Sequence, residues 1–340
     1  MNPLFKRYSR QMLFSGIGED GQNRISSATI LIIGCGALGT NLASQMVRAG
    51  VGTVKIVDRD YVEISNLQRQ VLFDESDVDQ QLPKAAAAVD KLKRINSDIR
   101  IESLIFDVTA KNIESMLSGV DLVLDATDNM ETRYLINDAC VKHGIPWIYG
   151  GVIGATGMTM DVIPGKSACL QCLSETPPAA GSMPTCETEG VLGGAPAVVA
   201  SIQATEALKI LVGHHPAGGE LIHFDLWENE FNRFHVHRRP DCQACVKGQF
   251  SFLAGSGSTD VFSLCGRNAV QITSSDENRL DLQDLKKRLT RLGPVTDNGF
   301  FLTFKVDSYE LMIFPDTRTI IKGTTDETVA RDLFAKYVGT

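Results

Sequence analysis

A glycine-rich turn between two apolar segments constrains the fold of this sequence more than any other feature. Residues 29–33 (TILII) form a short β-branched apolar run, which is typical of a strand buried on both faces of a parallel sheet. The motif Gly34-x-Gly36-x-x-Gly39 follows and opens a segment with apolar residues at helical spacing. A second apolar run, residues 53–57 (TVKIV), ends directly before Asp58. This order predicts a βαβ unit.

The turn has the chemistry of a nucleotide-binding loop. Glycines let the backbone approach a phosphate at the positive amino end of a helix, and the carboxylate of Asp58 can bind a ribose hydroxyl. Asp58 lies 19 positions after Gly39, which fits such a fold. The alternative is a tight structural turn that binds no ligand. The motif alone does not distinguish NAD from ATP.

The alternation of strand and helix patterns continues along the chain. We expect a helix from Pro83, strands at 99–104 and 120–126, a helix at 131–143, a strand at 146–149, a helix at 197–212, and strands at 223–226 and 230–236. These elements predict a doubly wound, Rossmann-like α/β fold with a mostly parallel sheet and an antiparallel extension.

The chain of 340 residues is longer than a single hydrophobic core usually supports. We predict a first domain over residues 1–250, a linker over 251–260 whose small residues suit flexibility, and a small α+β domain over 261–340. In that last domain we expect strands at 269–272, 300–306, 309–314 and 319–322, and helices at 280–292 and 327–338. No motif assigns it a role.

Composition excludes several classes of partner. The 33 Lys and Arg residues against 41 Asp and Glu residues give a net charge of −8, without a long basic run, so no nucleic acid partner is expected. No segment resembles a signal peptide or a membrane span, so we expect a cytoplasmic protein that binds no membrane. In that reducing compartment the eight cysteines indicate metal binding or thiol chemistry rather than disulfides.

Polar residues gather where the predicted strands end. Asn66 and Arg69 follow the second strand, Lys84 begins a predicted helix, and Asp128 follows the strand at 120–126. Because ligands of open α/β sheets bind at the carboxyl ends of strands, the two cations indicate neutralisation of a triphosphate, and Asp128 could hold magnesium. The alternatives are solvated surface charges for Arg69 and Lys84, and a helix N-cap for Asp128.

Two cysteine pairs suggest a metal site. Cys169-x-x-Cys172 and Cys242-x-x-Cys245 supply four thiolates, the ligand set of a structural zinc ion with no open position. The 69 residues between the pairs make a longer gap than that of a compact zinc ribbon. Reduced free thiols or a redox pair are the alternatives.

Several motifs together resemble the ThiF/MoeB/HesA family, bacterial relatives of the ubiquitin-activating enzymes. The resemblance covers roughly residues 6–246. The motifs are Arg7-Tyr-Ser-Arg-Gln11, the glycine-rich turn, Asp58-x-Asp60, Ser65-Asn-Leu-Gln-Arg-Gln70, Pro83-Lys84 and Asp125-Ala-Thr-Asp-Asn129. The block from Ser65 to Gln70 is the most distinctive of them. Many members of the family also carry two C-x-x-C pairs at these places, which supports zinc.

The resemblance implies an ATP-dependent enzyme that adenylates the C-terminal glycine of a ubiquitin-like sulfur carrier, either ThiS or MoaD, with ThiS slightly favoured. By this resemblance Asp58 would bind the ribose, Asn66, Arg69 and Lys84 the phosphates, and Asp128 magnesium. Arg10 would reach the phosphates from the neighbouring subunit of a homodimer. A cysteine desulfurase could supply persulfide sulfur.

Cys186 lies in residues 174–190, a segment rich in Pro, Gly, Ser and Thr that predicts a mobile crossover loop. Some members of the family use a cysteine there to form a covalent link with the carrier, and others have one without depending on it. Both interpretations stay open. Two other classes also remain as alternatives, an NAD-dependent oxidoreductase and a non-catalytic scaffold related to the ubiquitin-activating enzymes.

Overall fold

A computed structural model describes residues 3–178, 185–186, 188–214, 218–255, 261–264, 268–272 and 280–338. The chain forms two compact units. The first comprises residues 1–79 and 83–256, and the second comprises residues 80–82 and 257–340.

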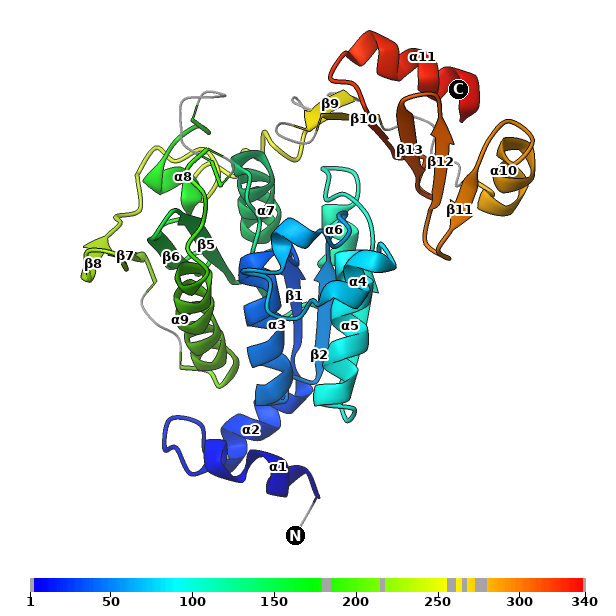
Figure 1. Cartoon of the computed structure of the whole chain (residues 1–340). Helices are drawn as coiled ribbons and strands as arrows, with labels where there is room; N and C mark the ends of the chain where they lie inside the picture. The colour runs from blue at the N-terminus through cyan, green and yellow to red at the C-terminus, as the bar shows by residue number, and fades with distance from the viewer. Residues whose placement is uncertain are drawn as a thin grey trace. The chain divides into compact units, whose positions relative to one another are not determined.

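The first unit is built on a sheet of eight strands (Figure 1). Their bounds are β1 Thr29–Ile33, β2 Thr53–Val57, β3 Arg100–Leu104, β4 Leu122–Asp125, β5 Trp147–Ile153, β6 Thr156–Val162, β7 Glu220–Asp225 and β8 Glu230–His235. The strand order is β3-β2-β1-β4-β5-β6-β7-β8. Pairing is parallel from β3 to β5 and antiparallel from β5 to β8. The predicted doubly wound sheet with an antiparallel extension is therefore confirmed.

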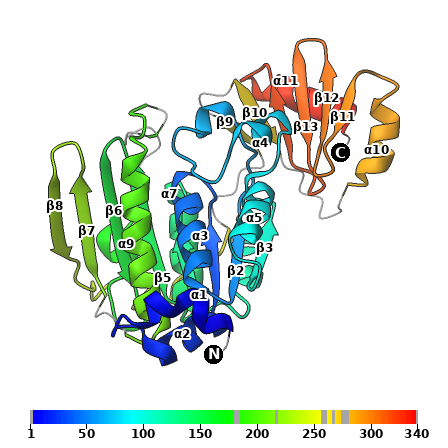
Figure 2. The ribbon, with the colours of Figure 1, turned by 60° about the horizontal axis from the view of Figure 1, so that its bottom comes forward.

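Helices cover both faces of this sheet. Figure 2 shows α3 (Ala37–Ala49), α5 (Lys84–Ile95) and α9 (Gly194–Leu211) over one face, where α3 packs between the other two. On the other face α6 (Ile113–Met116) and α7 (Met130–His143) enclose a core that includes Trp147 and Tyr134. Shorter helical segments are a 3-10 turn at Ile64–Asn66, α4 (Glu75–Asp79) and α8 (Leu170–Leu173). No helix in the described ranges is long and apolar enough to span a membrane.

Two helices that the sequence analysis does not predict precede the sheet. They are α1 (Pro3–Met12) and α2 (Gly18–Ser27). Tyr8 anchors α1, since its side chain is buried and its hydroxyl accepts a hydrogen bond from Asn96 Nδ2 at 2.8 Å. The Tyr8 ring also lies against Gly50, where an added Cβ would be 2.3 Å from the ring atom Cζ. Gly50 and Asn96 end α3 and α5, so α1 is held at the edge where the parallel strands begin.

The predicted crossover segment is only partly described. Residues 174–178, 185–186 and 188–190 form neither helix nor strand, and residues 179–184 and 187 lie outside the described residues. Of the predicted linker, 256–260 also lie outside them.

The second unit has one antiparallel sheet in the order β11-β12-β13-β14-β10-β9. Its elements are β9 Val261–Leu264, β10 Ala269–Ile272, α10 Leu282–Leu289, β11 Val295–Asp297, β12 Leu302–Val306, β13 Tyr309–Ile313, β14 Thr319–Lys322 and α11 Glu327–Tyr337. Apolar residues of both helices pack with the sheet into one core. The predicted α+β fold is confirmed, and β9 and β11 are additional. Asn298 Nδ2 also donates to the Gln81 carbonyl at 3.0 Å, which joins residues 80–82 to this unit.

The contact between Tyr8 and Gly50 generates a stability prediction. Gly50→Ala forces a left-handed residue (φ 82°) to carry a Cβ that meets the Tyr8 ring. Gly144→Ala is the matched control, because Gly144 caps α7 with φ 68° and an added Cβ there would meet nothing within 4 Å. Urea unfolding should show about 1 kcal/mol lost in the control and about 1–3 kcal/mol more in Gly50→Ala. Equal losses of unfolding free energy in the two variants would show that the Tyr8 ring of α1 does not pack tightly against Gly50.

Candidate functional site

The glycine-rich turn lies against the end of β4. At Gly34 (φ 96°) an added Cβ would be 2.5 Å from the Ala126 carbonyl oxygen, and at Gly39 it would be 2.0 Å from the Gly34 carbonyl oxygen. Both positions therefore require glycine for packing within the protein. Gly36 differs, because its Cβ would meet only Gln70 Nε2, at 3.9 Å. The space at Gly36 is therefore open to a ligand phosphate.

Asp58 is held in place directly beside this turn. Its Oδ2 accepts a hydrogen bond from the Cys35 N–H at 2.6 Å, and its Oδ1 accepts one from the Asp60 N–H at 2.7 Å. Burial raises the pKa of Asp58, and the nearby Lys84 ammonium opposes that rise. The two backbone donors fix the orientation of the carboxylate where β2 ends, as ribose binding requires.

Lys84 reaches the same place from the start of α5. Its ammonium lies 3.1 Å from Asp60 Oδ2, and its backbone N–H donates to the Asp60 carbonyl at 2.8 Å. The lysine side chain is only 6% exposed, so the ion pair is shielded from water on the lysine side. The structure therefore brings Lys84, Asp58 and the turn together, as the sequence predicts.

The segment after β2 contains Asn66, Arg69 and Gln70, of which Gln70 lies beside Gly36 of the turn. Asn66 is buried, and its Oδ1 accepts from the Glu63 N–H at 3.2 Å. Arg69 is half-buried and donates to the Ser65 carbonyl at 2.8 Å. Gln70 is buried with its Oε1 lacking a hydrogen-bond partner among the described residues. An unpaired buried oxygen near Gly36 is a position where a bound ligand could supply the donor.

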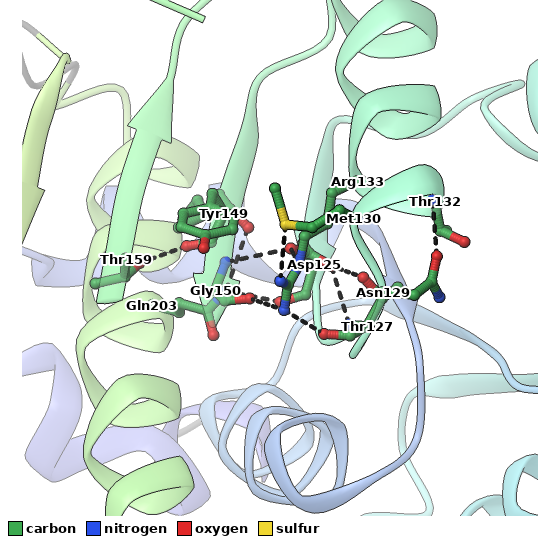
Figure 3. A network of polar contacts seen from close by, with 11 residues as sticks. Asp125, Thr127, Asn129, Met130, Thr132, Arg133, Tyr149, Gly150, Thr159 and Gln203 are labelled. Carbon is green, nitrogen blue, oxygen red and sulfur yellow. Dashed lines mark hydrogen bonds and ion pairs between the residues drawn. The ribbon is translucent and has the colours of Figure 1, made fainter. Parts of the chain in front are cut away.

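A buried network connects the end of β4 with the middle of β5 (Figure 3). Asp125 Oδ1 accepts from the Thr127 N–H at 2.9 Å and from its hydroxyl at 2.7 Å, and Oδ2 accepts from the Gly150 N–H at 3.3 Å. Arg133 of α7 lies with Nε 3.4 Å from Asp125 Oδ2 and donates through Nη2 to the carbonyls of Thr127, at 2.6 Å, and Gly150, at 3.1 Å. Gln203 of α9 donates to the Asp125 carbonyl at 2.9 Å.

Asp128 follows this network and is exposed. Its carboxylate makes no hydrogen bond or ion pair with another described residue, whereas the next residue, Asn129, caps α7 by accepting from the Thr132 N–H at 2.8 Å. The helix-cap alternative for Asp128 is therefore wrong, and Asn129 is the cap. An exposed carboxylate beside the glycine-rich turn is a suitable oxygen ligand for Mg²⁺.

Cys186 lies close to these groups although much of the surrounding segment is not described. Its thiol is 3.5 Å from the Val152 carbonyl oxygen, at the end of β5. Burial raises the pKa of the Cys186 thiol, and the Asp128 carboxylate raises it further, while Arg69 and Arg133 lower it. The cysteine is therefore near the predicted phosphate-binding residues, but it is mostly a neutral thiol at pH 7.

Arg10 is the predicted site residue that the single chain does not bring to the others. It is exposed on α1, which Tyr8 fixes at the opposite edge of the sheet, beyond the amino ends of the parallel strands (Figures 1 and 2).

The four cysteines of the two C-x-x-C pairs form a single cluster. Their sulfur atoms all lie within 4.8 Å of one another, with Cys169 to Cys242 at 3.6 Å and Cys172 to Cys245 at 3.5 Å. A tetrahedral site with zinc–sulfur bonds of about 2.3 Å requires sulfur–sulfur distances of roughly 3.8 Å. The Arg239 N–H also donates to the Cys172 sulfur at 3.4 Å. The donor set fits zinc.

Buried polar residues of α7 support this cluster. Asn137 Oδ1 accepts from the Leu170 N–H at 2.9 Å, and Asp138 accepts from Gln171 Nε2 at 2.9 Å and from the Phe252 N–H at 3.0 Å. Burial raises the pKa of Asp138 to about 6. Helix α7 thus places Arg133 beside the end of β4. One turn later, its residues bind the segments that bear the cysteines.

Sequence analysis misses Arg133, Asn137, Asp138 and Gln203. Each is a polar residue on a helix, where a polar residue is usually expected to face solvent. A polar residue in the run Thr132-Arg-Tyr-Leu-Ile-Asn-Asp138 could have been a signal, because it interrupts an otherwise apolar face.

Two known proteins resemble this chain over most of their length. The 44% identical sulfur carrier protein ThiS adenylyltransferase of Bacillus subtilis (strain 168) aligns over 336 residues, 98% of this chain and 99% of its own length. The sulfur carrier protein adenylyltransferase of Thermus thermophilus is 40% identical over 245 residues, 70% of this chain and 90% of its own length.

Among solved structures, Escherichia coli MccB with ATP superimposes with a TM-score of 0.61 at 21% identity, covering 72% of this chain and 74% of that chain. This likeness supports the fold. The family model described as "ThiF family" matches residues 8–244. The resemblance inferred from the sequence motifs is therefore confirmed, and the chain belongs to the ThiF family.

Proposed function

We propose that this enzyme uses ATP and magnesium to adenylate the C-terminal glycine of a ubiquitin-like sulfur carrier protein. The observation that carries the proposal is the arrangement of Asp58, Lys84 and Asp128 around the glycine-rich turn of a ThiF-family chain. The chain is an adenylyltransferase, as are the Bacillus and Thermus relatives that match most of its length.

The reaction needs charge neutralisation rather than a general base. A C-terminal carboxylate, with a pKa of about 3.5, is already ionised at pH 7. One of its oxygens attacks the α-phosphorus of ATP, and the bond from that phosphorus to the bridging oxygen of pyrophosphate breaks. Cationic side chains and magnesium are the groups that stabilise the departing pyrophosphate.

The residues suit these tasks in the following way. Asp58 binds the ribose, Asn66, Arg69 and Lys84 bind the phosphates, and Asp128 ligates the magnesium ion, which offsets phosphate charge when bound. Because Tyr8 fixes α1 at the far edge of the sheet, Arg10 can serve the reaction only from the partner subunit of a homodimer. That geometry supports a homodimer with composite sites.

ThiS is the preferred carrier, since the relative that aligns over nearly the whole chain is named for it, and MoaD is the second candidate. No described residue distinguishes the two carriers. No observation favours the oxidoreductase, and the scaffold alternative conflicts with the retention of every predicted nucleotide-binding residue.

Pyrophosphate exchange tests the adenylation chemistry. Labelled pyrophosphate should enter ATP only when a carrier ending in Gly-Gly is present. The variants Arg69→Ala, Lys84→Ala and Asp128→Ala should each lose about 2–4 kcal/mol of transition-state stabilisation, or roughly 100-fold to 1,000-fold in rate. Lys93→Ala, which removes an exposed lysine from the same helix as Lys84, is the control and should exchange normally.

Exchange without any carrier would argue against a carrier substrate. Normal exchange in Asp128→Ala would remove the magnesium role of that residue. Comparing ThiS and MoaD in the same assay, each with its own Gly-Gly end, identifies the cognate carrier.

A second part of the proposal concerns the cysteine cluster. The four sulfur atoms support a structural zinc, because all four positions of a tetrahedral ion would be filled by protein. The metal would connect α8, between β6 and the crossover segment, to the chain beyond β8.

Elemental analysis should find one zinc ion per chain, and a strong chelator should lower the melting temperature. Cys242→Ser should lose the metal and the chelator effect together. Cys140→Ser is the control, because Cys140 is buried but lies outside the cluster, so the metal content should be unchanged. Fresh protein without zinc would refute the site.

A third part concerns Cys186. Its proximity to Asp128 and Arg69 supports a covalent role, in which its thiolate attacks the acyl carbon of the adenylate, a thioester forms and AMP leaves. Alternatively, a persulfide donated to Cys186 by a cysteine desulfurase attacks the same carbon, and an acyl disulfide forms as AMP leaves.

Intact-mass analysis after incubation with carrier, ATP and magnesium should reveal a thiol-labile adduct. Because the pKa of Cys186 is raised, adduct formation should accelerate up to at least pH 9 as the thiolate fraction grows. Cys186→Ser should abolish the adduct and leave pyrophosphate exchange intact. Normal sulfur transfer by that variant would make Cys186 an ordinary loop cysteine.

A further inference from the structure

Arg133 is a buried cation that the adenylation chemistry described above does not use. Its side chain is 10% exposed. It lies 5.3 Å from the centre of the Tyr149 ring, and Nη1 donates to the Met130 sulfur at 3.4 Å. Burying a guanidinium is costly unless its donors are satisfied, so this residue has a strict geometric requirement.

One acceptor of Arg133 lies directly before Asp128 in the chain. Nη2 donates to the carbonyl oxygen of Thr127 at 2.6 Å, and that carbonyl belongs to the peptide group that joins Thr127 to Asp128. Since a peptide group is planar, fixing its oxygen fixes the direction in which the chain enters Asp128. Nη2 also donates to the Gly150 carbonyl of β5 at 3.1 Å, so the same nitrogen fixes the Thr127–Asp128 peptide group relative to the sheet (Figure 3).

The Asp128 carboxylate has no hydrogen-bond or ion-pair partner among the described residues. The Arg59 and Arg133 guanidinium groups attract it at longer range. The backbone sets the position from which the side chain extends, and on the far side of Asp128 the next residue, Asn129, caps α7. Arg133 and Asn129 therefore hold the backbone before and after Asp128.

We propose that Arg133 is a positioning residue that orients Asp128 for binding the metal ion of the metal–nucleotide complex. The inference rests on the proposed function, because it requires Asp128 to be a metal ligand. It assigns Arg133 no contact with substrate. A lysine has a single terminal nitrogen and could not keep the contacts of Nε with Asp125 and of Nη1 with Met130 as well as those with both carbonyls, so the full set of contacts requires arginine.

The test measures metal binding directly, without turnover. Mn²⁺ replaces magnesium, the nonhydrolysable analogue AMPCPP occupies the nucleotide site, and the EPR signal of free Mn²⁺ reports binding. The Mn²⁺ dissociation constant should rise about tenfold in Arg133→Gln and less in Arg133→Lys, the low end of the range for residues that support metal ligands. Arg94→Lys, an exposed arginine on α5, is the matched control and should bind like wild type.

Calorimetric titration of ATP in the presence of EDTA measures the metal-free ATP affinity. This affinity distinguishes a loss of Asp128 orientation from a general disruption of the nucleotide site. Metal-free ATP affinity should stay within about twofold of wild type in both Arg133 variants, since the glycine-rich turn and Asp58 are untouched. Arg133→Lys provides the comparison where Arg133→Gln unfolds. Equal losses of metal-free ATP binding and Mn²⁺ binding would overturn the proposal in favour of a structural role.

Asp128→Ala separates the positioning role of Arg133 from the metal-binding role of Asp128. Weakened Mn²⁺ binding in Asp128→Ala together with normal binding in both Arg133 variants would refute the positioning role and leave the proposed function intact. Normal Mn²⁺ binding in Asp128→Ala would remove Asp128 as a metal ligand, and the inference would fail with that part of the proposed function.

Discussion

The rest of the first unit depends on the hydrogen bonds and the ion pair that surround the buried Asp125 carboxylate. It is fully buried at the end of β4, and burial raises its pKa, with the Arg133 guanidinium as the largest opposing influence. An unpaired charge there would cost several kcal/mol, so its partners are obligatory. Those partners come from the loop after β4, from β5 and from α7, while Gln203 brings α9 to the same strand end. One carboxylate therefore holds β5, α7 and α9 in place around the end of β4.

Much of the fold can be predicted from the sequence because apolar periodicity reports burial. The strands β1 and β2 have the predicted bounds, since each is a β-branched run that ends at Gly34 or Asp58. Helix α1 has apolar residues at helical spacing in Leu4, Tyr8 and Met12, but the helix covers only ten residues, and its anchoring depends on Asn96, 88 positions after Tyr8. Strand β11 has only three residues, which is too few for an alternating pattern to stand out.

The candidate site divides in the same way. Asp58 and Lys84 are identified by motifs, and the structure brings them to one place with the glycine-rich turn. Arg133 and Gln203 are recognised only in the folded chain, because they donate to backbone carbonyls, which every residue carries and no motif marks. Spacing also could not pair the two C-x-x-C motifs across 69 residues, whereas the folded chain places all four sulfur atoms within 4.8 Å.

The cysteine cluster has a consequence for the unfolded chain. A metal held by Cys172 and Cys242 would act as a polymer crosslink, closing a loop that contains the crossover segment, α9, β7 and β8. Closing a loop of this length restricts the unfolded ensemble by about 4 kcal/mol in the chain-entropy description. Such a restriction offsets the conformational freedom of a long connection rich in Pro and Gly. The elements between the two cysteine pairs would then refold as one topologically closed unit.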